Sequence, residues 1–403
     1  MKQLTFNKKD IGIHMIFFLM MFHGVLEEYS NIFKYVDELF TVAIFILGIF
    51  YLFFYKGKFD RTNGVLLIGL VLFNLMGWMS SIISGYRDIK VLLASALLSN
   101  KFFLVMIGTM CLLTTANREW IMKYIRKYSR PMMVILFLWQ TIANATGKIP
   151  VFSEVNLCAK TVFLTALIFF NWRGKKDWWV LLLSLLLLIS TGKGKAYGAV
   201  LLIIIFLWWI IYLEKRISIL EISVMALGLM VVAWNKIVYY FVYGLQAQFP
   251  RIMLMKYGAQ LANIRFPWGT GWGTFGSHYA AEYYSPVYVE LGWINHFCLG
   301  IKHTGYLNDS FWPTIYTESG WIGFLGFILF LVCFFLKIQK IYCIDKKLYA
   351  GVMLSYSYLL ITTIESTAYS QPSLILMGVL WGIAVSNKKV DSEQGRYYNN
   401  EVI

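Results

Sequence analysis

Acidic and histidine side chains in one long polar segment are the groups of this chain best suited to proton transfer. The segment covers residues 242–318 and contains Asp309, its one aspartate, and Glu318, which stands just before an apolar run. A carboxylate at such a boundary should face a polar cavity, pair with a cation, or lie at a helix N-terminus where the dipole favours negative charge. His303, like two other histidines of the segment, could be a general base or donor, or simply a surface residue.

Two groups of basic residues could bind a phosphorylated substrate. Arg251 and Arg265 lie near the start of the polar segment, and Lys193 and Lys195 lie in a short turn between two apolar runs. Single cations at a membrane interface often only extend toward lipid headgroups. Two such groups at the same face of a bilayer would suit a pyrophosphate, which needs several point charges or a guanidinium fork.

The polar segment is also rich in aromatic residues and glycines. We interpret Trp272, Tyr283, Tyr284 and Trp312 as platforms on which sugar rings could pack. The glycine run PWGTGWGTFG, residues 267–276, contains GxGxxG spacing but lacks the strand and helix that a dinucleotide site requires. Its glycines therefore predict either a tight backbone turn or backbone amides that line an anionic headgroup.

The composition indicates that helices in a lipid bilayer position these residues. The chain is 59% hydrophobic and 14% charged, whereas soluble domains carry about 25% charged residues. The net charge of +15 comes from short basic clusters between apolar runs. This distribution is typical of the connections that set the orientation of a membrane protein, and not of a nucleic-acid-binding surface. Five cysteines without paired spacing and scattered histidines predict neither a disulfide framework nor a metal site.

Apolar segments along the chain predict the transmembrane helices. A bilayer-crossing helix needs about 20 apolar residues, and roughly twelve segments approach that length. They are 11–27, 38–55, 64–84, 101–116, 131–146, 155–172, 177–191, 196–213, 217–241, 320–337, 348–365 and 371–386. Segment 177–191 is short for a span, and segment 91–100 is predicted to be interfacial or re-entrant.

The predicted fold class is thus an all-α polytopic membrane protein. Residues 1–241 form an N-terminal bundle of about nine spans, and residues 242–319 form a long extracytoplasmic loop that carries the active site. Residues 320–387 form the C-terminal transmembrane helices, and residues 388–403 form a cytoplasmic tail. Basic clusters occur in every second connection, which places both termini in the cytoplasm and the long loop outside.

These features together resemble the superfamily of O-antigen polymerases and O-antigen ligases, which are bacterial membrane glycosyltransferases. In that superfamily a long extracytoplasmic loop opens with an arginine, continues through a Pro–Gly-rich stretch that ends in phenylalanine, and closes with E-x-G-x-x-G. The corresponding elements here are Arg251, residues 267–275, and Glu318 with Gly320 and Gly323. The turn TGKGKA is similar to the superfamily's basic residue between two earlier spans, with Lys195 as the best match.

The resemblance implies a GT-C-like architecture and a metal-independent, cofactor-free glycosyltransferase in the bacterial cell membrane, with its active site facing outward. It favours a polysaccharide polymerase that transfers a growing glycan from undecaprenyl pyrophosphate to an incoming lipid-linked repeat unit. Arg251 and Lys195, supported by Arg265 and Lys193, would hold the pyrophosphate. The bilayer, a chain-length regulator and a flippase are the partners expected beside the lipid-linked donor and acceptor.

One departure from the pattern bears on the reaction. Ligases of the superfamily carry a His–Asn pair about nine residues before the glutamate, where this chain has Asp309–Ser310. The departure favours a polymerase in which Asp309 is the base and His303 its substitute, while Glu318 orients Arg251 or the loop. A ligase and a lipid-linked oligosaccharide flippase remain alternatives; the flippase is less favoured because nearly all charges stand at span ends, with Lys160 the main exception.

Overall fold

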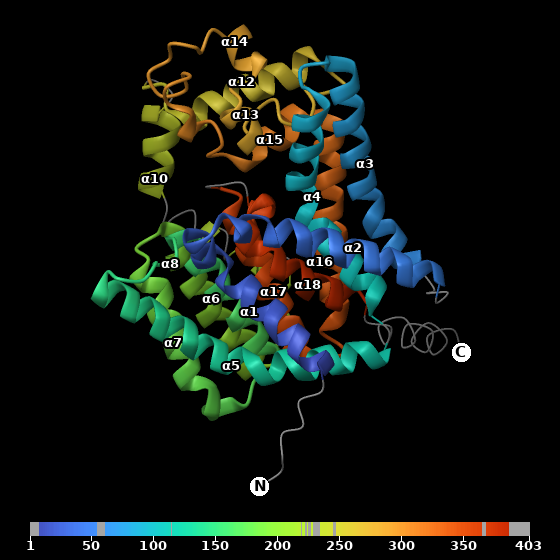
Figure 1. Cartoon of the computed structure of the whole chain (residues 1–403), viewed down its shortest axis with the longest axis vertical. Coiled ribbons are helices and arrows are strands. Elements are labelled where there is room, and N and C mark those ends of the chain that lie inside the picture. The colour runs from blue at the N-terminus through green and yellow to red at the C-terminus, as the bar shows by residue number, and fades with distance from the viewer. Residues whose placement is uncertain are drawn as a thin grey trace.

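The computed structural model describes residues 8–54, 61–113, 115–218, 220–221, 224, 227–228, 234–244, 247–364 and 368–386, and every regular element among them is helical (Figure 1). The α-helices before the polar segment are α1 (Lys8–Tyr29), α2 (Val36–Phe54), α3 (Arg61–Ser84), α4 (Ile89–Leu112), α5 (Thr115–Thr146), α6 (Glu154–Phe170), α7 (Trp178–Ser190), α8 (Gly194–Phe206) and α10 (Trp234–Val238). The later ones are α12 (Pro250–Ile264), α13 (His278–Glu282), α14 (Pro286–Glu290), α15 (Phe311–Glu318), α16 (Gly320–Ile341), α17 (Lys346–Thr362) and α18 (Ile375–Val385). Short 3-10 or π turns join them: η1 (Asn31–Tyr35), η2 (Gly174–Asp177), η3 (Leu207–Tyr212), η4 (Tyr239–Tyr243), η5 (Thr304–Tyr306), η6 (Ala368–Ser370) and η7 (Pro372–Leu374).

Five helices among the described residues are long and apolar enough to cross a membrane. They cover Asn31–Phe54, Asn63–Ser84, Ile89–Leu112, Gly194–Tyr212 and Gly320–Ile341, and Ile375–Val385 is a shorter apolar helix. The all-helical, multi-pass membrane class is therefore supported, while the count of twelve spans stays a prediction. Parts of the segment 217–241 and the whole tail 388–403 lie outside the described residues.

The structure corrects the prediction for residues 91–116. We expected an interfacial or re-entrant piece followed by a span, but both belong to the single helix α4, which ends at Leu112. The helix continues past Lys101 because the buried ammonium group of this residue is neutralised by Asp37 of α2, with 2.5 Å between Nζ and Oδ2. The predicted span 177–191 corresponds to α7, whose 13 residues would rise only about 20 Å.

Glycines allow the most extensively packed helix pairs to approach each other closely. A Cβ atom on Gly69 of α3 would lie 2.5 Å from the carbonyl oxygen of Gly326 in α16. A Cβ atom on Gly48 of α2 would likewise lie 2.5 Å from the carbonyl oxygen of Gly108 in α4. Lipid tails are as apolar as leucine, so helices in a bilayer associate through such close backbone contact rather than through the hydrophobic effect.

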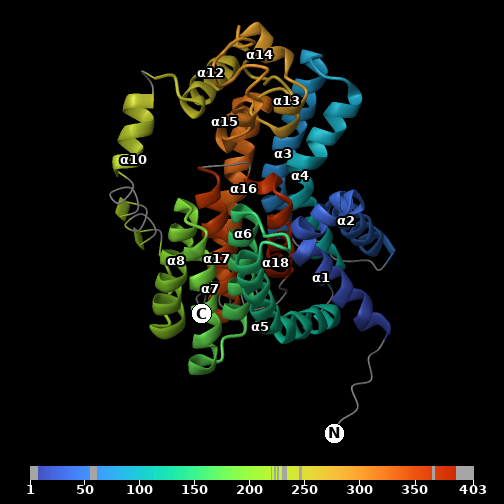
Figure 2. The ribbon, with the colours of Figure 1, turned by 60° about the vertical axis from the view of Figure 1, so that its left-hand side comes forward.

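Residues 250–318 form a compact cap of short helices at one end of α3, α4 and α16 (Figures 1 and 2). The cap has its own apolar core, which includes Leu254, Phe275, Tyr288 and Leu299. Helix α12 packs on α15, and α15 is followed directly by α16. The polar segment is thus a folded unit attached to the membrane helices, and it holds most of the candidate site residues.

The glycine contact between α3 and α16 can be tested with a matched pair of substitutions in α3. Gly69→Ala should destabilise the protein by about 1–3 kcal/mol, because the added methyl group would overlap the Gly326 backbone. Gly64→Ala is the control, since nothing lies within 4 Å of its Cβ position, and it should be neutral or stabilising by up to about 1 kcal/mol. Thermal unfolding of the two variants in detergent measures the difference; equal melting temperatures would contradict the contact.

Candidate functional site

Glu318 is the last residue of the cap and stands directly before the membrane helix α16. Its side chain is fully buried at the end of α15. Its Oε1 atom accepts hydrogen bonds from the backbone amides of Thr274 (2.9 Å) and Phe275 (3.1 Å) and from the Ser277 hydroxyl (2.7 Å). The carboxylate therefore holds the glycine run in place, and it does not contact Arg251. Burial raises the pKa of Glu318 to about 7, although the three donors favour the charged form.

The glycine run lies against the C-terminal end of α3. The amide of Gly269 donates to the Ser80 hydroxyl, and that of Trp272 donates to the Ser81 hydroxyl, both at 2.8 Å. Gly271 has a φ of +91°, and a Cβ atom there would lie 2.6 Å from the Cα of Ser81. Because these amides already donate to the protein, the geometry favours a tight packed turn over a cradle for an anionic headgroup.

Arg251 and Asp309, predicted to bind pyrophosphate and to act as the base, form an ion pair. The Nε atom of Arg251 donates to Oδ2 of Asp309 over 2.7 Å. The two side chains remain 27% and 34% exposed, so the pair lies at the surface of the cap rather than in its core. Arg251 stands in the first turn of α12 and Asp309 two residues before α15, so the packing of α12 on α15 brings them together.

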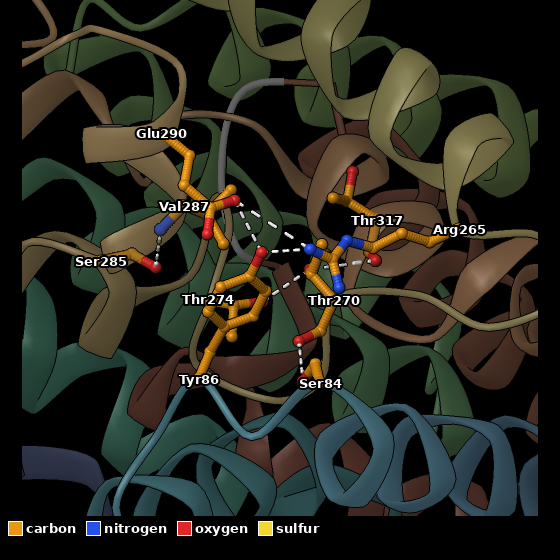
Figure 3. A network of polar contacts seen from close by, with 9 residues as sticks. All are labelled: Ser84, Tyr86, Arg265, Thr270, Thr274, Ser285, Val287, Glu290 and Thr317. Carbon is orange, nitrogen blue, oxygen red and sulfur yellow. Dashed lines mark hydrogen bonds and ion pairs between the residues drawn. The ribbon is translucent and has the colours of Figure 1, made fainter.

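Arg265 belongs to a second network, shown in Figure 3. Its guanidinium group stacks over the Tyr86 ring, 4.7 Å from the ring centre, and also donates to the Tyr86 hydroxyl. That hydroxyl donates to Oε2 of Glu290 over 2.6 Å, and Glu290 lies 4.0 Å from Arg265. Burial and the Glu290 carboxylate raise the pKa of Tyr86 to about 12. A diphosphate at Arg265 would have to compete with Glu290.

The two lysines expected to complete the pyrophosphate site lie in another part of the molecule. Lys193 pairs with Glu154 of α6 over 2.6 Å, and Lys195 is buried in the first turn of α8. Helix α8 packs against α6, α7 and α17, whereas Arg251 lies in the cap (Figure 2). The described contacts therefore do not bring the two groups of cations together.

The aromatic residues predicted to bind sugars differ in exposure. Trp272 is only 1% exposed and packs edge-on against Phe73, with ring centres 5.2 Å apart. This placement corrects the prediction for Trp272, because protein atoms cover the faces that a sugar ring would need. Trp312 packs edge-on against Phe311, its neighbour in α15, and against Phe324 of the membrane helix α16.

Tyr283 and Tyr284 lie at the surface of the cap. Tyr283 is 55% exposed and stacks on Tyr279, with 9° between the ring planes. The hydroxyl of Tyr284 donates to the carbonyl oxygen of Leu299, which fixes its ring against the cap core. Of the four predicted platforms, Tyr283 thus presents the most open aromatic surface.

The predicted histidine substitute does not approach the Arg251–Asp309 pair in any described contact. His303 is exposed and precedes the short turn η5. His278 instead lines a narrow pocket between the cap and α4, together with Ser99 and Thr314, and its Nε2 atom lies 3.3 Å from Glu282. Among the described residues, no three His, Cys, Asp or Glu side chains are close enough to hold a metal ion together.

Two charged contacts were not anticipated from the sequence. Arg87, in the short connection between α3 and α4, donates through Nε to the carbonyl oxygen of Gly273 over 2.7 Å, and burial lowers its pKa. Within the bundle, Asp37 pairs with Lys101 over 2.5 Å, and His23 Nε2 lies 3.7 Å from the other Asp37 oxygen. Lys101 therefore joins Lys160 as a buried charge within an apolar helix, which corrects the expectation that charges stand at span ends. The available signal was that only Ser99, Asn100 and Lys101 separate two apolar runs.

No protein-family model matches this chain, and no curated protein sequence is significantly similar to it.

The buried carboxyl group of Glu318 predicts a pH-dependent stability. Because its pKa in the folded protein is about 7, well above the ordinary value, its contribution is greatest below about pH 4.5 and is lost as the pH rises through 7. Glu318→Gln keeps an oxygen that can accept the same hydrogen bonds but cannot ionise. The melting temperature of the variant minus that of the wild type should therefore rise between pH 5 and pH 7.

The exposed Glu28 of α1 provides the control for this measurement. Glu28→Gln should leave the pH dependence of the melting temperature close to that of the wild type. Parallel pH profiles for wild type and Glu318→Gln would show that the carboxyl group of Glu318 is already charged in the folded protein.

Proposed function

We propose that this protein is a membrane polysaccharide polymerase that joins lipid-linked oligosaccharide repeat units outside the cell membrane. One observation carries the proposal. Three of the four segments on which the resemblance depends, at Arg251, at residues 267–275 and at Glu318, form one structural unit, whereas the turn that contains Lys195 lies apart from them. Glu318 binds the backbone of the glycine run, and the helix that ends at Glu318 packs against the helix that begins beside Arg251.

The Arg251–Asp309 pair is the centre of the proposed reaction. The acceptor hydroxyl oxygen forms a bond to the anomeric carbon of the donor sugar, and the bond from that carbon to the pyrophosphate oxygen breaks. Asp309 takes the proton of the hydroxyl group, and Arg251 stabilises the charge on the undecaprenyl pyrophosphate that leaves. A positioned base contributes about 10²–10⁴-fold to such a step, and a pyrophosphate needs little acid assistance to leave.

The same Arg251–Asp309 contact has a second consequence for substrate binding. The hydrogen bond from Nε fixes the plane of the guanidinium group, so that its orientation is set before the substrate arrives. Arg265 and the two lysines would act at later points along the path of the lipid-linked substrate, since other carboxylates already pair with Arg265 and Lys193. Tyr283 offers its ring to a sugar at the surface of the cap.

In this proposal the chain has about twelve spans in a GT-C-like arrangement, with both termini in the cytoplasm and the cap outside. A bacterial flippase delivers the lipid-linked units, and a chain-length regulator acts beside the polymerase. A ligase that transfers finished glycan to another acceptor would use the same cap. It is distinguished from a polymerase by its product, which carries the glycan on a new acceptor.

A transporter of lipid-linked oligosaccharide is the second candidate, and the buried Asp37–Lys101 pair favours it. Ionisable residues within transmembrane helices often mark substrate or proton pathways. Both side chains are 1% exposed, and His23 lies beside them. In a transporter, Lys101→Met would abolish movement of the lipid-linked unit across vesicles, whereas in a polymerase such movement would not occur with the wild type.

Arg251→Ala should abolish polymer formation in membranes supplied with the matching lipid-linked repeat unit, because the leaving pyrophosphate loses its guanidinium partner. The readout is the ladder of glycan lengths on a gel. Lys302→Ala, which removes an exposed cation from the same cap, should leave the ladder intact. A normal ladder from a folded Arg251→Ala protein would refute the proposed site.

Asp309→Asn separates the role of a base from that of a positioning group. Asparagine retains an oxygen that can accept the hydrogen bond from Arg251 but cannot take a proton. If Asp309 is the base, the polymerisation rate should fall by about 10²–10⁴-fold while the amount of bound lipid-linked donor stays nearly constant. Full activity of a folded Asp309→Asn protein would show that this carboxylate only orients Arg251.

A further inference from the structure

A pocket lies at the end of α16 remote from the cap. It is lined by Arg216, Ser218 and Gln339, together with the apolar residues Leu220, Phe335 and Leu336. Gln339 stands 19 residues after Gly320, where α16 leaves the cap, so a straight helix separates the two ends by about 28 Å. The hydrocarbon core of a bilayer is about 30 Å thick. The pocket is therefore at the level of the opposite membrane interface.

Hydrogen-bond donors in this pocket lack acceptors. Arg216 donates through Nε to the side-chain oxygen of Gln339 over 2.6 Å. The Nε2 atom of Gln339 is buried, in a side chain that is 4% exposed, and has no acceptor among the described residues. Burying an amide donor without a partner is unfavourable. The Nη groups of Arg216 likewise have no acceptor in the part of the chain that the structure describes, so the pocket has donors for an oxyanion.

The local charge is strongly positive. Residues 214–221 and 337–347 contain six lysines and arginines and three carboxylates. Glu214 is paired with Lys346 over 2.5 Å, Asp345 caps α17, and Glu221 accepts a hydrogen bond from the backbone amide of Ser218. Each carboxylate thus has a partner, and the excess of cations would attract an anion to Arg216.

The apolar side chains that line the pocket favour an amphiphile over a free anion as its ligand. Leu220 and Leu336 are 74% and 49% exposed, and the half-buried Phe335 also lines the pocket. A free phosphate would leave these side chains uncovered, whereas an acyl chain would cover them while its phosphate group meets Arg216 and Gln339. Guanidinium groups are well suited to a phosphate because they donate in a planar fork.

We propose that this pocket binds an anionic phospholipid, with the phosphate group at Arg216 and Gln339 and an acyl chain along Leu220, Phe335 and Leu336. The site is independent of the proposed polymerase activity, since it lies at the other end of α16 from the cap. By holding a lipid between the connection 214–218 and α16, it ties this interface of the bundle to the bilayer.

The experiment uses the full-length protein purified in a neutral detergent. Phosphatidylglycerol, phosphatidylcholine and inorganic phosphate are titrated separately, and binding is followed by native mass spectrometry and by the melting temperature. Phosphatidylglycerol should bind and raise the melting temperature more than phosphatidylcholine does. In Arg216→Ala its dissociation constant should be about tenfold higher, because a charge-assisted hydrogen bond is lost.

Lys215→Ala is the matched control, since it removes one exposed positive charge next to Arg216 but does not line the pocket. It should bind phosphatidylglycerol like the wild type. If Arg216→Ala fails to fold, Arg216→Lys and Gln339→Leu decide the question, and each should weaken binding. Equal effects of the two lipids, or equal weakening by Lys215→Ala, would overturn the proposal. Stabilisation by inorganic phosphate alone to the same extent would show a phosphate site and overturn the assignment to a lipid.

Discussion

The hydrogen bonds of the Glu318 carboxylate are the interaction on which the arrangement of the cap depends. Burying a carboxyl group is costly unless donors satisfy it, and Oε1 of Glu318 receives the amides of Thr274 and Phe275 and the Ser277 hydroxyl. These donors can reach it because the glycine run lies directly against the ends of α3 and α15. The glycine run held in this way bonds in turn to Ser80 and Ser81 of α3, which places the cap on the membrane helices. The position of the Arg251–Asp309 pair follows from the packing of α12 on α15.

The membrane bundle is held together by a different kind of contact. Lipid provides no hydrophobic drive for helices to associate, so the bundle depends on close backbone approach at glycines and on polar groups between helices. Gly69 and Gly48 supply the first kind, and the Asp37–Lys101 pair supplies the second. Removal of either partner of a buried ion pair leaves an uncompensated charge, so this pair constrains the bundle even if it takes no part in transport.

The two ends of α16 differ in how their cations are neutralised. In the cap, Arg251 and Arg265 pair with Asp309 and Glu290, so the anionic substrate of the proposed reaction would bind in competition with carboxylates and could be released again. At the other end, the donors of Arg216 and Gln339 lack acceptors among the described residues. The first arrangement suits a substrate that must bind and leave, and the second suits a lipid that stays bound.

The sequence by itself determined the class of protein, because composition and the length of apolar runs reflect the solvent in which a chain folds. It also located the segment that forms the cap. Within that segment it singled out Asp309 as the one aspartate, Arg251 near the start and Glu318 at the end. The partners of these residues could not be read from the sequence, because they depend on which helices pack together. Thus only the tertiary structure showed that Asp309 pairs with Arg251 across 58 residues, and that Glu318 binds the glycine run rather than Arg251. Tertiary packing also decided that Trp272 is buried and that Lys101 is neutralised by Asp37, because exposure and charge pairing are properties of the assembled helices and not of residue type.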